Sequence, residues 1–280
     1  MDELYVMARR VLLDALEALG AHRDAIILVG AQAVYLRVGE ADLAVAPYTT
    51  DGDLAIDPSA LGRIPPLERE LIAAGFMPKT SESVGVWIAR RQTSMAVETN
   101  VQIDLLVPAS VSPGKGRRAA RLPGHDSRAA RIVNGLEGAL VDADVLRVAA
   151  LDPDDARHLN VRVAGSAALL VAKVHKIADR TDTDRLSDKD ALDVLRLLRG
   201  TPTNELVRRF RGLLGDDRSA ATAKVGRTLF EAQFAKRTGV GVEMAIRSAG
   251  PLADADEIAA SCEVLAKDLL RSLEARGLSR

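Results

Sequence analysis

Residues 49–57 of this chain read Thr-Thr-Asp-Gly-Asp-Leu-Ala-Ile-Asp, and this stretch decides how the fold is interpreted. Asp51 and Asp53 stand two residues apart, directly before an apolar run that ends at Ile56. The pattern predicts a strand over residues 51–56, in which side chains two apart project from the same face. Two carboxylates held side by side repel each other, and a divalent cation such as Mg²⁺ commonly offsets them. A solvated strand end is the alternative for this motif taken alone.

A glycine turn precedes this strand. Residues 25–29 are apolar and predict a short buried strand, and residues 32–38 predict a helix. Gly30 and Ala31 lie in the turn between them. Such a turn aims free backbone N–H groups and the positive end of the helix at whatever lies in front, which suits a phosphate. A plain strand-to-helix turn is the alternative.

Asp104 is a carboxylate inside an otherwise apolar predicted strand, residues 101–107. Burying an unpaired charge is costly, so Asp104 should have a partner or face a cleft. A third carboxylate beside Asp51 and Asp53 would complete a two-metal site for phosphoryl transfer. The alternative is a strand-end acid that accepts hydrogen bonds from the backbone.

Two charged runs follow on successive predicted helices, over residues 166–180 and 187–199. The first run carries cations three and four residues apart, so they share one helix face. The second run sets a lysine and two carboxylates near one another. As an alternative, the two runs pair with each other as surface salt bridges, which contribute little to stability. The residues are Lys173, Lys176 and Arg180 in the first run, and Lys189, Asp190 and Asp193 in the second.

A basic segment lies between the sheet and the helices. Residues 113–124 are rich in Gly, Pro and Arg and predict an exposed loop. Basic side chains in and after this loop could follow an RNA backbone through phosphate contacts. A solvated loop is the favoured interpretation. The basic residues are Lys115, Arg117, Arg118, Arg121, Arg128 and Arg131.

The composition excludes several classes of protein. The 280 residues carry 38 Lys plus Arg against 39 Asp plus Glu, so net charge gives no reason to expect nonspecific nucleic-acid binding. The single Cys262 forms no internal disulfide and is expected to be a buried thiol. The first residues lack a signal-peptide pattern and no apolar run approaches the length of a membrane span. We therefore expect a cytoplasmic protein that does not contact a membrane.

The predicted elements divide the chain near residue 165. Before it, helices and strands alternate, and after it every predicted element is a helix. We therefore predict an α+β protein with a mixed sheet flanked by helices in residues 1–165 and a helical bundle in residues 166–280. The remaining predicted helices are 3–19, 66–74, 203–214, 219–236 and 254–275, and the remaining strands are 84–89, 130–133, 145–150 and 161–163.

These motifs, in this order, resemble the nucleotidyltransferase superfamily, which has the DNA polymerase β-like fold. In particular they resemble the AbiEii-type toxins of bacterial toxin–antitoxin systems, including the mycobacterial MenT-like group. The resemblance covers roughly residues 25 to 200. Gly30 matches the glycine of the superfamily's opening motif, and Ala31 stands where the superfamily has Gly or Ser. Thr49, Asp51 and Asp53 match the Thr-x-Asp-x-Asp form that this group often shows.

The resemblance implies a role for each motif. Asp51, Asp53 and Asp104 would hold Mg²⁺ in a two-metal site, and Asp104 would also help to deprotonate an attacking hydroxyl. Lys173 would contact the nucleotide phosphates, with Arg180 in support. Asp190 and the catalytic Asp193 would contact substrate or fix these cations by charge-assisted hydrogen bonds. The other residues implied in nucleotide binding are Gly30, Ala31, Thr49, Lys176 and Lys189.

As a whole, the resemblance implies a Mg²⁺-dependent enzyme that transfers a nucleoside monophosphate from an NTP to an acceptor. As a toxin it would act on the 3′ end of tRNA, and a cognate antitoxin would be its partner. Two alternatives stay open. The acceptor would instead be a hydroxyl of a small molecule or a protein, or the domain would bind nucleotide or a partner without catalysis. Ala31 and the long spacer over residues 32–50 favour the second alternative.

Overall fold

The computed structural model describes residues 2–39, 49–112, 118–181 and 188–275. The chain forms two compact units, each assembled from separate segments of the sequence. Unit 1 comprises Met1–Gln32, Pro47–Val133 and Ala143–Val163. Unit 2 comprises Ala33–Ala46, Asn134–Asp142 and Ala164–Arg280. The two-domain division near residue 165 stays a prediction.

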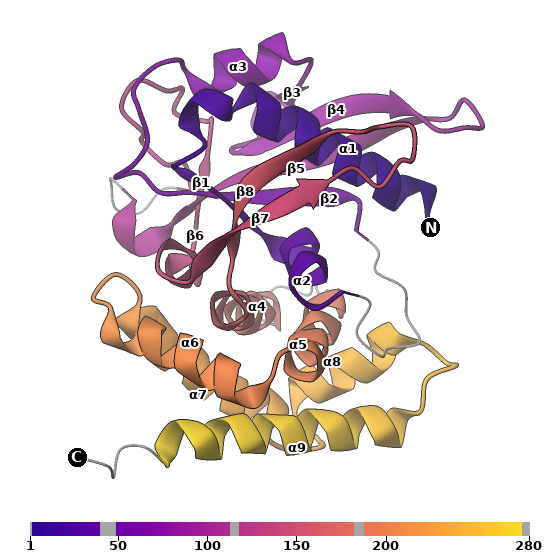
Figure 1. Ribbon diagram of the computed structural model, residues 1–280, viewed down its shortest axis with the longest axis vertical. Helices are drawn as coiled ribbons and strands as arrows, with labels where there is room; N and C mark the ends of the chain where they lie inside the picture. Colours follow the sequence, from indigo (N-terminus) through magenta and orange to yellow (C-terminus); the bar gives the residue numbers. More distant parts are fainter. Residues whose placement is uncertain (1, 40–48, 113–117, 182–187, 276–280) are drawn as a thin grey trace. The chain divides into compact units, whose positions relative to one another are not determined.

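The chain has the predicted α+β class, with a mixed sheet and a C-terminal helical region (Figure 1). The sheet has eight strands in the order β3-β4-β5-β2-β1-β8-β7, and β6 pairs with β5 off this path. The strands are β1 (Ile26–Val29), β2 (Asp51–Ile56), β3 (Met77–Pro78), β4 (Val86–Gln92), β5 (Glu98–Pro108), β6 (Arg131–Val133), β7 (Ala143–Ala149) and β8 (His158–Ala164).

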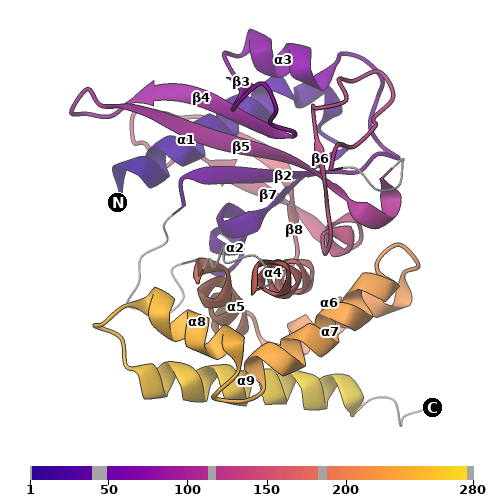
Figure 2. The ribbon, with the colours of Figure 1, turned by 180° about the vertical axis from the view of Figure 1, so that it is seen from behind.

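Strand β2 lies in the middle of the sheet. It pairs antiparallel with β1 and parallel with β5. In this register Asp53 of β2 lies opposite Val29 of β1 on one side and opposite Asp104 of β5 on the other. Its residues Leu54 to Ile56 are fully buried, because both neighbouring strands are apolar. Figure 2 shows β4, β5 and β2 side by side, with helix α1 behind them.

Helix α1 (Glu3–Ala18) covers one face of this sheet. Asp2 begins the helix, because its side chain accepts hydrogen bonds from the N–H groups of Leu4 and Tyr5 at 2.9 and 3.2 Å. The apolar stripe predicted over residues 3–19 is buried against β2, β5 and helix α3 (Leu67–Ala73). A side chain at Gly52 would meet Leu12 Cδ1 at 3.2 Å, so α1 lies directly over β2.

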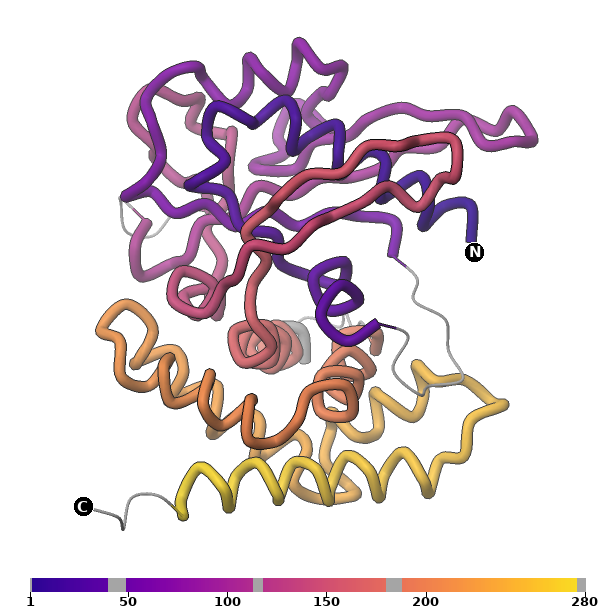
Figure 3. Tube along the Cα trace, in the orientation of Figure 1, coloured from indigo at the N-terminus to yellow at the C-terminus, as the bar shows by residue number. Residues whose placement is uncertain are grey.

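Long hairpins extend beyond the buried part of the sheet. The predicted strands 84–89 and 101–107 are longer in the structure, since β4 runs to Gln92 and β5 starts at Glu98. Their outer residues are polar and partly exposed, so hydrophobicity does not reveal them, whereas cross-strand hydrogen bonds hold them. The tube in Figure 3 shows this hairpin and the one that joins β7 to β8.

Unit 2 consists mainly of helices packed around α4. This helix packs against α5, α6 and α7, and α9 packs against α5, α6, α7 and α8. The fully buried side chains of Phe210, Phe230 and Phe234 fill the space between them. The helices are α4 (Ser166–Thr181), α5 (Lys189–Gly200), α6 (Thr203–Gly215), α7 (Ala220–Phe234), α8 (Val240–Ala249) and α9 (Ala255–Glu274).

Helix α8 was not predicted, because it is short and follows a glycine. Gly241 lies in its first turn, where a Cβ would meet the Phe234 ring at 2.5 Å. The glycine therefore lets α8 approach α7 closely. Because glycine is unfavourable in helices, it also weakens the sequence pattern that would predict α8. The remaining short elements are helix α2 (Gly30–Val38) and the 3-10 turns η1 (Gly20–His22), η2 (Ala109–Val111) and η3 (Glu137–Leu140).

Two further side chains lie in the interior of the protein. Trp87 is buried, and its indole N–H donates to the Ala129 carbonyl at 3.0 Å. Cys262 is buried as expected. No helix in the described part of the chain is long and apolar enough to cross a membrane.

Candidate active site

The three predicted carboxylates meet on one face of the sheet. Asp53 of β2 lies directly opposite Asp104 of β5, and Asp51 lies opposite Gln102. Gly52, between the two acids of β2, faces Leu12 of α1. Because side chains alternate along a strand, the acids project from the face opposite α1. The parallel pairing of β2 and β5 therefore brings Asp104 beside Asp53.

Gly30 closes one side of this acidic cluster of Asp51, Asp53 and Asp104. Its φ of +72° lies in the left-handed region, and a Cβ there would stand 2.0 Å from Asp53 Oδ2. The Asp53 carboxylate thus packs against the bare Cα of Gly30, which only glycine permits. Helix α2 begins at Gly30, one residue before Ala31. The turn predicted to bind phosphate is therefore in contact with the acid strand.

Several side-chain donors already bind these carboxylates. The Thr49 hydroxyl donates to Oδ1 of Asp51. Gln102 Nε2 donates to Oδ1 of Asp104 at 2.9 Å, and the Arg131 guanidinium donates to its Oδ2 at 2.5 Å. Both oxygens of Asp104 are therefore engaged.

Asp104 has an electrostatic environment unlike that of a surface acid. Its side chain is only 5% exposed. Burial raises the pKa of Asp104 to about 7, and the negative charges of Asp53 and Asp51 act in the same direction. Arg131 and the hydrogen bond from Gln102 act in the opposite direction. The positive charge of Arg131 therefore does not offset the combined effect of burial and of the two neighbouring carboxylates on Asp104.

A second layer of buried side chains holds the start of β2. Gln32 Nε2 donates to the Asp51 carbonyl at 3.0 Å, and Arg9 Nε donates to Gln32 Oε1 at 2.8 Å. Arg9 also donates to the Ala149 carbonyl at 3.1 Å. Arg9 and Gln32 are both almost fully buried. Their hydrogen bonds tie α1, α2, β2 and β7 together at the backbone of Asp51.

The donor set fits a hard divalent cation by its chemistry. Asp51, Asp53 and Asp104 offer carboxylate oxygens, the ligands that Mg²⁺ prefers, and their mutual repulsion favours a cation among them. Their present positions do not form a metal cage: within the described residues, no group of three or more His, Cys, Asp or Glu is arranged to hold an ion. The hydrogen bonds from Thr49, Gln102 and Arg131 occupy oxygens that a cation would need.

A second charged cluster lies inside unit 2. Lys173 of α4 donates to Oδ1 of Asp190 and to Oδ2 of Asp193, both on α5 and both at 2.7 Å. Arg196 donates to the other oxygen of Asp193 at 3.0 Å. These four side chains are at most 5% exposed. The two charged runs therefore do pair, but as a buried network and not as the surface salt bridges considered above.

The charge of Lys173 is secured by its two partners. Burial alone lowers the pKa of a lysine, but here the carboxylates of Asp190 and Asp193 outweigh burial and raise the pKa of Lys173 above its usual value. Lys173 is therefore a permanent cation that joins α4 to α5. This is the fixing of Lys173 by Asp190 and Asp193 that was one of the two predicted roles for these acids.

The other predicted cations lie in different surroundings. Lys176 is 41% exposed, and its ammonium lies 3.3 Å from Oδ1 of Asp190. Lys189 is exposed in the first turn of α5. Arg180 belongs to α4, and its side chain lies outside the described residues. Lys173 and Lys176 converge on one carboxylate, that of Asp190.

Sequence reasoning missed the residues that surround the predicted ones. Arg131 was counted among the basic residues of the loop and also fell in the predicted strand 130–133, which the structure has as β6; what was missed is that Arg131 binds Asp104. The apolar neighbours Ala130, Ile132 and Val133 indicated the strand, but nothing in the sequence pointed from Arg131 to Asp104. Gln32 follows directly on Gly30-Ala31, and nothing in its spacing points to the Asp51 carbonyl.

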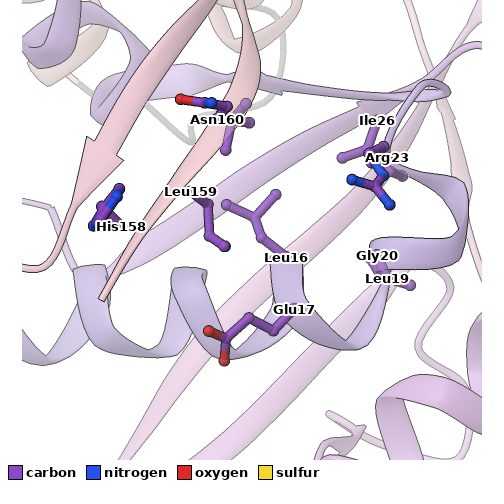
Figure 4. Close-up of a pocket in the computed structure, with 10 residues that line it drawn as sticks. Leu16, Glu17, Leu19, Gly20, Arg23, Ile26, His158, Leu159 and Asn160 are labelled. Atoms are coloured by element: carbon purple, nitrogen blue, oxygen red, sulfur yellow. The ribbon is translucent and has the colours of Figure 1, made fainter. Parts of the chain in front are cut away.

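A separate pocket of about 480 Å³ lies in unit 1 between α1, η1 and β8. Figure 4 shows Leu16 and Leu159 on its walls, with Glu17, Arg23 and His158 around them. None of the predicted site residues lines it.

This chain is similar to a solved structure described as that of an antigenic nucleotidyltransferase-like protein from Paracoccidioides brasiliensis. The two are 14% identical, the match covers 80% of this chain and 93% of that chain, and the TM-score is 0.39. No protein-family model matches the sequence, and no curated protein matches it.

Proposed function

We propose that this chain is a Mg²⁺-dependent nucleotidyltransferase. The observation that carries the proposal is the register of β2 and β5, which sets Asp53 directly beside Asp104 with Asp51 on the same face. Three carboxylates on adjacent strands, with the pKa of Asp104 raised by burial and by the charges of the other two, are the donor set that phosphoryl transfer requires. The Gly30 turn supplies backbone N–H groups next to them.

The reaction joins an acceptor hydroxyl to a nucleoside monophosphate. The hydroxyl oxygen attacks the α-phosphorus of an NTP, the bond to the bridging oxygen of the β-phosphate breaks, and pyrophosphate leaves. Asp51, Asp53 and Asp104 would hold Mg²⁺, which when bound neutralises the charge that develops on the phosphates. A carboxylate whose pKa lies near 7, such as Asp104, is suited to accept the proton of the hydroxyl.

The proposed roles in unit 2 follow the charges found there. Lys176 is exposed enough to reach a phosphate, while Lys173 is enclosed by Asp190 and Asp193. We assign phosphate contact to Lys176, Arg180 and Lys189, and we assign to Lys173 the holding of α4 against α5. Direct contact between Lys173 and a phosphate, the role implied by the resemblance, would require its release from two carboxylates.

The acceptor and the biological role come from the resemblance stated above. We propose that the chain acts as a toxin on the 3′ end of tRNA and that a cognate antitoxin neutralises it. The test is to incubate the purified protein with Mg²⁺ and each α-labelled NTP, together with tRNA, total RNA or protein extract. We expect labelled tRNA. Labelled protein or metabolite would move the acceptor to the alternative class.

Two variants of one strand sharpen this test. Asp53→Asn removes a carboxylate of the acidic cluster and should abolish labelling. Asp57→Asn is the matched control, because Asp57 lies just beyond the end of β2 and its side chain accepts hydrogen bonds from Ser59. Labelling that persists in Asp53→Asn would overturn the catalytic role of the cluster. For the toxin role, expression should arrest growth, and Asp53→Asn should relieve the arrest.

A further inference from the structure

Arg131 meets the acidic cluster in an unusual way. It starts β6, which pairs in parallel with β5 and places Arg131 opposite Leu106, two residues beyond Asp104. From there its guanidinium reaches back to Oδ2 of Asp104 at 2.5 Å. One basic side chain thus binds a carboxylate of the acidic cluster, and it takes the position next to Asp104 that a metal ion would need.

The two partners of this ion pair differ in how they are held. Asp104 is 5% exposed and fixed in a central strand, whereas the Arg131 side chain is 38% exposed. Arg131 Nε is buried and has no hydrogen-bond partner among the described residues. A guanidinium with an unsatisfied buried N–H gains less from its position than a fully bonded one. Arg131 can therefore leave toward solvent, while Asp104 cannot move.

We propose that Arg131 is the resident counter-ion of the acidic cluster, and that a divalent cation must displace it from Asp104 in order to bind. This inference rests on the proposed function, because it takes Asp51, Asp53 and Asp104 as the metal ligands. In the absence of metal, Arg131 offsets part of the negative charge of the cluster through its ion pair with Asp104. Its departure then frees Oδ2 of Asp104 for the cation.

The first test measures Mn²⁺ binding, with no nucleotide present, by electron paramagnetic resonance of the free ion. Arg131→Gln removes the competitor and should tighten binding by about tenfold or more, the factor expected when one charged hydrogen bond no longer opposes binding. Lys79→Gln is the matched control for loss of one positive charge. Lys79 donates to Gln102 at 3.0 Å and reaches Asp104 only through that side chain, so its loss frees no Asp104 oxygen.

The second test is made on the unchanged protein and uses a variant only to assign the signal. Arginine side-chain nitrogen resonances of the full chain are followed by NMR during addition of diamagnetic Mg²⁺, with Arg131 assigned from its absence in Arg131→Lys. We expect the Arg131 signal to shift as the ion pair opens, at the same Mg²⁺ concentration that saturates the site. A structural arginine would keep its signal unchanged, and that result would overturn the inference.

The variant Asp53→Asn distinguishes failure of the proposed metal site from failure of the counter-ion role of Arg131. If Mn²⁺ binding is lost in Asp53→Asn but is no tighter in Arg131→Gln than in Lys79→Gln, the counter-ion inference fails and the metal site stands. If Asp53→Asn binds Mn²⁺ as the unchanged protein does, the metal site itself fails, and the inference falls with it. If Arg131→Gln binds Mn²⁺ more tightly than Lys79→Gln does, and the double variant Arg131→Gln/Asp53→Asn loses this binding, the metal site and the counter-ion inference are both supported.

Discussion

The buried network around Lys173 gives the sharpest prediction about stability. Lys173→Met removes a cation that makes two 2.7 Å hydrogen bonds to Asp190 and Asp193, in a place where none of the three side chains exceeds 5% exposure. Removing one partner of a buried ion pair costs about 3–5 kcal/mol. Lys176 and Arg196 remain beside the two acids, so we expect the lower end, about 3 kcal/mol.

Urea unfolding measures this loss in the helices and in the sheet separately. Far-ultraviolet circular dichroism follows chiefly the helices of unit 2, and the fluorescence of Trp87, the one tryptophan of the chain, follows unit 1. With a slope of about 2 kcal/mol per molar urea, the helical midpoint should fall by roughly 1–2 M. Lys176→Met, which removes the same charge from a side chain 41% exposed, should cost less than about 1 kcal/mol.

A double variant distinguishes ion pairing from simple loss of packing. Lys173→Met combined with Asp190→Asn leaves Asp193 and Arg196 as a balanced pair. If charge imbalance is the cause, the double variant should be more stable than the sum of the single changes by about 0.5–3 kcal/mol. Additive effects, or equal losses in Lys173→Met and Lys176→Met, would refute the reasoning.

Three further experiments test the site and its surroundings: a substitution at Gly30, the pH dependence of stability and the labelling of Cys262. Gly30→Ala should cost about 1–2 kcal/mol from the left-handed φ alone and should also abolish Mn²⁺ binding, because the new Cβ would stand 2.0 Å from Asp53 Oδ2. Gly20→Ala, with open space around its Cβ, should change neither measurement. Burial raises the pKa of Asp104 to about 7, so the folded chain keeps a proton that the unfolded chain loses near pH 3.9. The free energy of unfolding should thus fall as pH rises from about 4 to about 7, by up to about 4 kcal/mol, and Asp104→Asn should remove this fall in metal-free buffer. Burial also raises the pKa of Cys262 to about 11, so a thiol reagent at neutral pH should label the protein only in denaturant, and prompt labelling of the native protein would contradict its burial.

The acid strand could be predicted because its signal is local. Alternation of Asp51 and Asp53 with buried residues specifies both a strand and a shared face, and the structure has β2 at residues 51–56 as predicted. The pairing of Asp53 with Asp104 is different in kind. It depends on the register of two parallel strands about fifty residues apart, which the hydrophobicity of either strand leaves open. Polarity marked Asp104 as unusual, but only the sheet gives it its neighbours.

The cations show the limit of sequence reasoning more clearly. Helical spacing placed Lys173 and Lys176 on one face, and the structure confirms that both approach Asp190. Spacing did not show that Lys173 is buried, because burial comes from the packing of α5 against α4. The contact between Arg131 and Asp104 was missed for a related reason. The strand that carries Arg131 was predicted, but its pairing with β5, off the main path of the sheet, is a tertiary contact that composition leaves open.

Exposure distinguishes Lys173 from Arg131, two cations that each bind a buried aspartate. Lys173 is buried, donates to two carboxylates at 2.7 Å and keeps its charge. Its removal should therefore lower the free energy of unfolding. Arg131 holds one acid, is 38% exposed and leaves its Nε without a partner among the described residues. Removal of Arg131 should therefore raise the affinity of the acidic cluster for a divalent cation. The same kind of contact, a basic group on a buried aspartate, thus predicts a fixed support in one case and an exchangeable counter-ion in the other.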